Sequence, residues 1–240
     1  MTGGPVYLFI HVPKTGGQTL RRWFEQWLGH GDGFVHLGPW GDRDRERRGF
    51  PDLEDLDAAG RDRVRCVLGH RVGQDTVAHF PDREVRWATF VRSPASRLAS
   101  LYNFEMGRRV ERGEPVEDFE SFAATQPRNP QLEFLARRLG VTRRSPDTLD
   151  AVSVHLERFW CAATTESMDR VLPAIFHDMG SPVVVPPRAN RSGIEHARLI
   201  ANDDPRVGAA TAGADLDRRL HELAGALECR WTRPGGHRSR

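Results

Sequence analysis

The hydrophobic positions near the start of the chain form two different patterns in succession. Residues 6–10 are a continuous run of apolar, β-forming side chains, which is typical of a buried strand. In residues 18–28 the apolar positions recur at three- and four-residue spacing, the pattern of an amphipathic helix. These positions are Leu20, Trp23, Phe24, Trp27 and Leu28. A turn with two adjacent glycines separates the two segments, so the pattern predicts a strand, a glycine loop and a helix.

The same succession occurs again further along the chain. Residues 64–68 and 85–91 are apolar strand candidates, and Pro94 suits the first turn of a helix that continues to about residue 105. Further helices are predicted at 130–139, 147–158, 167–179 and 215–228, and a short strand at 159–164. Strands that alternate with helices indicate an α/β protein, a three-layer sandwich with a central parallel sheet flanked by helices.

Residues 29–52 contain repeated Gly, Asp and Arg without periodicity, and we expect a long loop there that borders a substrate-binding mouth. The 240 residues have the length of one domain, and they contain no internal repeat, linker or low-complexity tract. We therefore expect residues 1–240 to form a single domain that ends in a frayed tail at about 231–240.

The charged residues nearly cancel, with 35 Lys+Arg against 33 Asp+Glu, and this balance argues against a nucleic-acid partner. The first apolar run is far shorter than the ~18 residues that span a bilayer, and no basic stretch precedes it. We therefore expect a soluble, cytoplasmic protein without a transmembrane segment. The three cysteines lie far apart, and we expect reduced thiols and no metal site. The oligomeric state stays open.

Lys14 is the single lysine of the chain, and the other 34 of its 35 basic residues are arginine. It lies between the first strand and helix, where backbone N–H groups and the helix dipole favour an anion such as phosphate. The loop is not a Walker A motif, because GxxxxGK[ST] has its lysine after the last glycine, whereas Lys14 precedes Gly16 and Gly17. His11, at the strand end, either lines this loop or packs beneath it.

The sequence PKTGGQTL at residues 13–20 resembles the 5′-phosphosulfate loop of sulfotransferases that use 3′-phosphoadenosine 5′-phosphosulfate, most closely the carbohydrate, heparan sulfate 2-O-type branch. In these families a strand-end arginine and a serine eight positions later hold the 3′-phosphate of the donor, and Arg92 and Ser100 have this spacing. Guanidinium groups bind phosphate in a bidentate manner, and a hydroxyl about two helical turns further on can face the same pocket. The family usually has Asp after the arginine, where this chain has Ser93.

Three further segments follow in the order that the family shows. Gly69 and His70 resemble the segment that carries its candidate catalytic base. Residues 164–166 resemble its strand-end Thr-Glu pair, and residues 190–193, which include Arg191, resemble its late donor-binding loop. The resemblance therefore extends over most of the chain, from about residue 5 to about residue 228.

The resemblance implies a role for each of these residues. Lys14 would stabilise the leaving oxygen, and His70, with an ordinary imidazole pKa of about 6.5, would take the proton of the acceptor hydroxyl. The loop backbone and the Thr19 hydroxyl would bind the 5′-phosphate, and the arginines and Ser100 the 3′-phosphate. The implied donor-binding residues are Lys14, Thr15, Gly16, Gly17, Gln18, Thr19, Arg92, Ser100 and Arg191.

The resemblance thus implies a P-loop-like fold and a sulfotransferase that needs no metal. Its donor would be 3′-phosphoadenosine 5′-phosphosulfate, and its acceptor a small molecule or glycan that offers a hydroxyl. Two alternatives stay open. A nucleotide-kinase-type phosphoryl transferase would share the sheet and the loop, but it should carry a Walker A motif and a metal-holding Asp. A non-catalytic nucleotide-binding relative of the sulfotransferases is the other, motivated by Ser93 in place of Asp.

Overall fold

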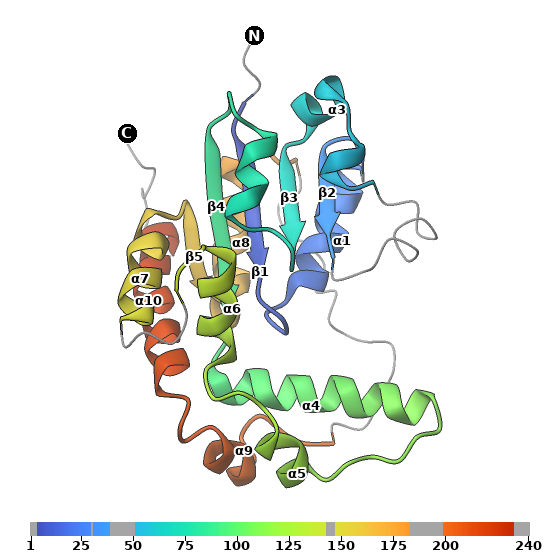
Figure 1. Ribbon diagram of the computed structural model, residues 1–240, viewed down its shortest axis with the longest axis vertical. Helices are drawn as coiled ribbons and strands as arrows, with labels where there is room; N and C mark the ends of the chain where they lie inside the picture. Colours follow the sequence, from blue (N-terminus) through green and yellow to red (C-terminus); the bar gives the residue numbers. More distant parts are fainter. Residues whose placement is uncertain (1–3, 30, 39–50, 143–146, 183–198, 233–240) are drawn as a thin grey trace.

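The computed structural model describes residues 4–29, 31–38, 51–142, 147–182 and 199–232 (Figure 1). Within these residues one sheet of five parallel strands has the order β2-β3-β1-β4-β5. The strands are β1 Val6–His11, β2 Phe34–Leu37, β3 Cys66–Gly69, β4 Val85–Val91 and β5 Cys161–Thr164. The α/β prediction of a parallel sheet flanked by helices is confirmed.

The helices follow the strands in the alternation that the sequence predicts. The α-helices are α1 Gly17–Leu28, α3 Ala58–Arg63, α4 Pro94–Glu111, α5 Phe119–Ala124, α6 Pro130–Arg138, α7 Thr148–Arg158, α8 Met168–Asp178, α9 Pro205–Ala210 and α10 Asp215–Thr232. Short 3-10 turns are η1 Leu53–Asp55, η2 Gln74–His79 and η3 Thr165–Ser167. The helices α3, α5 and α9 have six residues each, which is too short for a periodic pattern, and they were not predicted.

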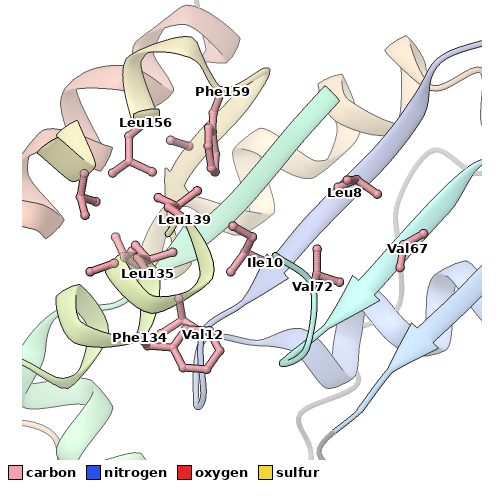
Figure 2. Packing of buried hydrophobic residues seen from close by; sticks show 14 of the residues in the cluster. Leu8, Ile10, Val12, Val67, Val72, Phe134, Leu135, Leu139, Leu156 and Phe159 are labelled. Atoms are coloured by element: carbon pink, nitrogen blue, oxygen red, sulfur yellow. The ribbon is translucent and has the colours of Figure 1, made fainter. Parts of the chain in front are cut away.

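The alternation of side chains along β1 builds the three layers. Leu8 and Ile10 point to one face, where they join buried residues of α6, α7 and α10. Figure 2 shows part of this cluster, including Ile10 of β1, Leu135 of α6 and Leu156 of α7. Phe9 points to the opposite face and packs with buried residues of α1 and α8. A strand that is buried on both faces is expected to read as the continuous apolar run at residues 6–10.

The predicted loop at 29–52 is wrong in one part, because residues 34–37 form the edge strand β2. This strand pairs in parallel with β3, from Phe34 opposite Cys66 to Leu37 opposite Gly69. Its four residues are all buried, but His36 interrupts the apolar run. A four-residue strand gives little local signal, and its stability comes from pairing with a segment about 30 residues away. Residues 39–50 lie outside the described residues.

Helix α4 lies across the carboxyl ends of the strands, below the arrowheads in Figure 1. The Ser93 hydroxyl accepts a hydrogen bond from the Ser96 N–H and caps the helix, and Pro94 occupies its first turn. Buried residues of α4, α5 and α9 form a separate small cluster that includes Tyr102 and Phe119. Packing in this cluster fixes the position of α4 beside the carboxyl ends of the strands.

Two further expectations concern the thiols and the membrane. Cys66 and Cys161 are buried, and the side chain of Cys229 lies outside the described residues. In the part of the chain that the structure describes, no helix is both long and apolar enough to cross a bilayer.

Gly69→Ala should destabilise the protein, because a Cβ at this position would lie 1.9 Å from the Leu37 carbonyl oxygen of the neighbouring strand. We expect the free energy of unfolding, measured with urea, to fall by about 2 kcal/mol, which is typical of overpacking. Gly208→Ala is the control, since a Cβ there meets nothing within 4 Å. Equal stability of the two variants would contradict the close approach of β2 to β3.

Candidate functional site

The candidate site lies where the chain direction across the sheet reverses. From β1 the chain continues to β2 and β3 on one side, and from β4 it continues to β5 on the other side. In open α/β sheets the loops after two such strands leave in opposite directions, and ligands bind in the crevice between the carboxyl ends of these strands. Lys14 follows β1 and Arg92 follows β4, so the fold brings the two predicted phosphate ligands to this crevice.

The loop after β1 holds Lys14 in an unusual backbone conformation. Its φ of 71° makes it the non-glycine residue with a positive φ in the described chain. The Thr15 hydroxyl donates a hydrogen bond to the Val12 carbonyl at 2.8 Å, and the Thr19 N–H donates to the Gly16 carbonyl. A left-handed conformation costs a residue with a side chain about 1 kcal/mol and is found often at functional sites.

Glycine is required at positions 16 and 17 of the loop for two different structural reasons. Gly16, at the N-terminus of α1, has a φ of 80° that favours glycine. A Cβ on Gly17 would lie 2.0 Å from an atom of the His11 ring. The His11 ring therefore occupies the space that a side chain at position 17 would need, and His11 packs against the loop.

The Lys14 side chain turns towards α4. Its Nζ lies 3.8 Å from the centroid of the Phe104 ring. Burial, together with the charges of Arg92 and Arg97, lowers the pKa of Lys14 to about 8, and the charge of Glu105 opposes this shift. An ammonium group held in a positive environment is typical of a site that binds an anion.

The Arg92 side chain reaches the same loop. Its Nη1 donates a hydrogen bond to the Lys14 carbonyl at 3.3 Å. Ser100 lies four residues before Phe104 on α4, and so on the same helix face as the ring that contacts Lys14. The fold thus brings Lys14 and Arg92 together and puts Ser100 on the helix face that borders them. Arg191 lies outside the described residues.

The backbone of Ser93, the residue after Arg92, is bound by the carboxylate of Glu166. The Ser93 N–H donates to Glu166 Oε1 at 3.0 Å, and His221 Nε2 lies 3.1 Å from Glu166 Oε2. Burial raises the pKa of Glu166, but the hydrogen bonds from His221 and Ser93 outweigh burial and hold it at about 2. Glu166 of η3 therefore places an ionised carboxylate at the Ser93 backbone, one residue after Arg92.

His70 follows β3, the strand next to β1, and its ring is fixed by His11. His70 Nδ1 lies 2.6 Å from the His11 carbonyl oxygen, and the two rings stack with centroids 4.3 Å apart. Because a carbonyl only accepts, Nδ1 carries the proton and Nε2 keeps a lone pair. Burial lowers the pKa of His70, and the charge of Arg138 lowers it further. His70 therefore has the tautomer and the neutral state of a base near pH 7.

The sequence analysis missed the supporting roles of two residues of this site, His11 and Gln131. His11 orients His70 through its carbonyl, and Gln131 of α6 binds both backbone groups of Arg92. A cavity of about 280 Å³ lies beside the first turn of α4, where Arg97, Arg128 and Asp217 are among its lining residues. Lys14, His70, Arg92 and Ser100 do not line it. Within the described ranges, no group of three or more His, Cys, Asp or Glu side chains is arranged to hold a metal ion.

Comparison with known proteins gives no family assignment. No protein-family model matches the sequence. A search of curated proteins finds no match. The functional argument therefore depends on the residues of the site.

Lys14→Gly should be more stable than Lys14→Ala, because both remove the buried ammonium but only glycine relieves the left-handed backbone. We expect a difference of about 1 kcal/mol in the free energy of unfolding at pH 7, measured with urea. The pair forms its own control, since the two variants differ by one methyl group. A more stable Lys14→Ala would show that the backbone at this position is not strained.

Proposed function

We propose that the protein is a sulfotransferase that transfers the sulfuryl group of 3′-phosphoadenosine 5′-phosphosulfate to a hydroxyl of a carbohydrate or another hydroxylated molecule. The contact between the Arg92 guanidinium and the Lys14 carbonyl carries this proposal. It brings the single lysine of the chain and the strand-end arginine together after two neighbouring strands, where both cations can bind the phosphates of one nucleotide. We further propose that the protein acts in the cytoplasm, on a small-molecule or glycan acceptor.

The N-terminus of α1 would bind the 5′-phosphate of the donor. This helix has 12 residues, no acidic residue in its first turn and no side-chain cap on its N-terminal N–H groups. Free N–H groups and the helix dipole favour an anion there, and the backbone of Gly16, Gly17 and Gln18 lies at this point. The Thr19 hydroxyl lies one residue further into the helix.

The 3′-phosphate would lie between Arg92 and α4. The guanidinium offers several N–H donors, and the Ser100 hydroxyl offers one more from the helix face that borders Lys14. A ligand with phosphates at both ends would thus span the crevice from α1 to α4. Two cations near each other, Lys14 and Arg92, would be stabilised by its negative charge.

In the transfer step the acceptor oxygen would form a bond to sulfur as the bond from sulfur to the bridging oxygen breaks. The electrons of that bond stay on the bridging oxygen of 3′-phosphoadenosine 5′-phosphate, and the Lys14 ammonium neutralises the charge that develops there. His70 Nε2 takes the proton of the acceptor hydroxyl. The products are a sulfate ester, the bisphosphate and a protonated His70.

Isothermal titration calorimetry with 3′-phosphoadenosine 5′-phosphate tests the donor site. We expect micromolar binding to the wild type and about tenfold weaker binding to Arg92→Ala, because a charged hydrogen bond to phosphate is lost. Arg63→Ala is the control, since Arg63 is exposed on α3 and pairs with Asp32. If ATP with magnesium binds and the bisphosphate does not, a phosphoryl transferase replaces this proposal; if neither binds, no nucleotide function remains.

The rate of transfer should depend on pH with two limbs. The value of kcat/KM should rise as pH increases through the pKa of His70, below 6.5, because the base must lose its proton. It should fall as pH increases through about 8, where Lys14 loses its proton. Labelled donor and a panel of sugars, glycans and hydroxylated metabolites provide the measurement.

Each limb has its own variant as a control. His70→Gln should lower the rate and remove the acidic limb. Lys14→Arg should remove the alkaline limb, because a guanidinium keeps its proton, and it should also lower the rate, because a planar fork replaces a point charge. If the acidic limb persists in His70→Gln, His70 is not the base. If the alkaline limb persists in Lys14→Arg, Lys14 is not the group whose loss of a proton stops the reaction.

A further inference from the structure

Gln131 of α6 binds the backbone of Arg92 from both sides of the residue. The Arg92 N–H donates to Gln131 Oε1 at 2.9 Å, and Gln131 Nε2 donates to the Arg92 carbonyl at 2.7 Å. β4 ends at Val91, where it pairs with Thr164 of β5, so Arg92 is the first residue beyond the paired strand. The primary amide thus provides the two hydrogen bonds that a neighbouring strand would otherwise provide. Gln131 is fully buried.

The amide of Gln131 is itself held by Asp217 of α10. One carboxylate oxygen of Asp217 accepts the Leu132 N–H at 2.8 Å. The other accepts the Gln131 N–H at 3.1 Å and lies 3.5 Å from Gln131 Nε2. In return the Asp217 N–H donates to Asn129 Oδ1. A buried carboxylate therefore caps α6 and fixes the side chain that holds Arg92.

The residues on either side of Arg92 are held by η3 instead. The Thr165 hydroxyl donates to the Val91 carbonyl at 3.0 Å, and Glu166 accepts the Ser93 N–H. Gln131 is therefore the side chain from α6 that acts on the backbone of Arg92 itself. A small shift of this backbone would move the guanidinium, at the end of a long side chain, away from the Lys14 carbonyl.

We propose that Gln131 is a positioning residue that directs the Arg92 guanidinium towards the 3′-phosphate of the nucleotide, with Asp217 holding Gln131 in place. This inference rests on the proposed function, because it concerns the site assigned there to the 3′-phosphate. It requires that Gln131 acts on one phosphate of the ligand and not on the whole nucleotide. A role in stability alone would affect both phosphates alike.

The test compares two nucleotides that differ by the 3′-phosphate. The dissociation constants of 3′-phosphoadenosine 5′-phosphate and of adenosine 5′-phosphate are measured by calorimetry on the wild type and on Gln131→Met. Methionine has a similar length but makes neither hydrogen bond. We expect about tenfold weaker binding of the bisphosphate, which corresponds to the loss of one to two hydrogen bonds, and unchanged binding of the monophosphate.

Gln126→Met is the matched control, because the Gln126 amide binds Phe122 and Thr125 of its own segment and, among the described contacts, makes none with Arg92. It should leave the ratio of the two dissociation constants as in the wild type. An unchanged ratio in Gln131→Met, or an equal weakening of both nucleotides, overturns the inference. If Gln131→Met does not fold, Gln131→Asn is measured by the same ratio, since its amide is one methylene group shorter and cannot reach both backbone groups of Arg92.

The wild type separates this inference from the proposed function. If the wild type binds the bisphosphate no more tightly than the monophosphate, Arg92 does not form a 3′-phosphate site, and both proposals fail. If the wild type prefers the bisphosphate and Gln131→Met keeps that preference, only the inference on Gln131 fails.

Discussion

The parallel pairing of β1 with β4 determines where the chemistry of this protein can occur. Its register sets Ile10 opposite Thr89 and His11 opposite Phe90, and the Thr89 hydroxyl reinforces it with a hydrogen bond to the Ile10 carbonyl. Because both strands end at the same level, the residues after them meet. Two cations, Lys14 and Arg92, are thereby held near each other at a cost in electrostatic energy, which a bound anion would offset.

Much of the fold could be predicted because its signals are local. The apolar run of β1, the helical spacing of α1 and the proline that opens α4 each lie within a few consecutive residues. Lys14 and Arg92 each come shortly after a predicted strand, but they were expected at one site because of the resemblance to the sulfotransferases. β2 could not be predicted, since its four residues depend on pairing with β3.

The supporting residues of the site could not be predicted for a related reason. Gln131 acts on a residue 39 positions earlier, and His11 acts on His70 through its carbonyl, 59 positions away. Hydrogen bonds between a side chain and a distant backbone leave no periodicity or composition in the sequence. Glu166 binds the Ser93 N–H in the same long-range manner, 73 positions further along the chain.

Because Lys14 is the single lysine among 35 basic residues, amine-directed reagents can label this one side chain selectively. Amine-directed reagents attack the uncharged form of lysine, and with a pKa of about 8 roughly half of the Lys14 side chains have this form at pH 8. The chain has no other lysine side chain to compete with it. Acylation of a single ε-amine, followed by mass spectrometry, would therefore report whether the crevice after β1 is open or covered.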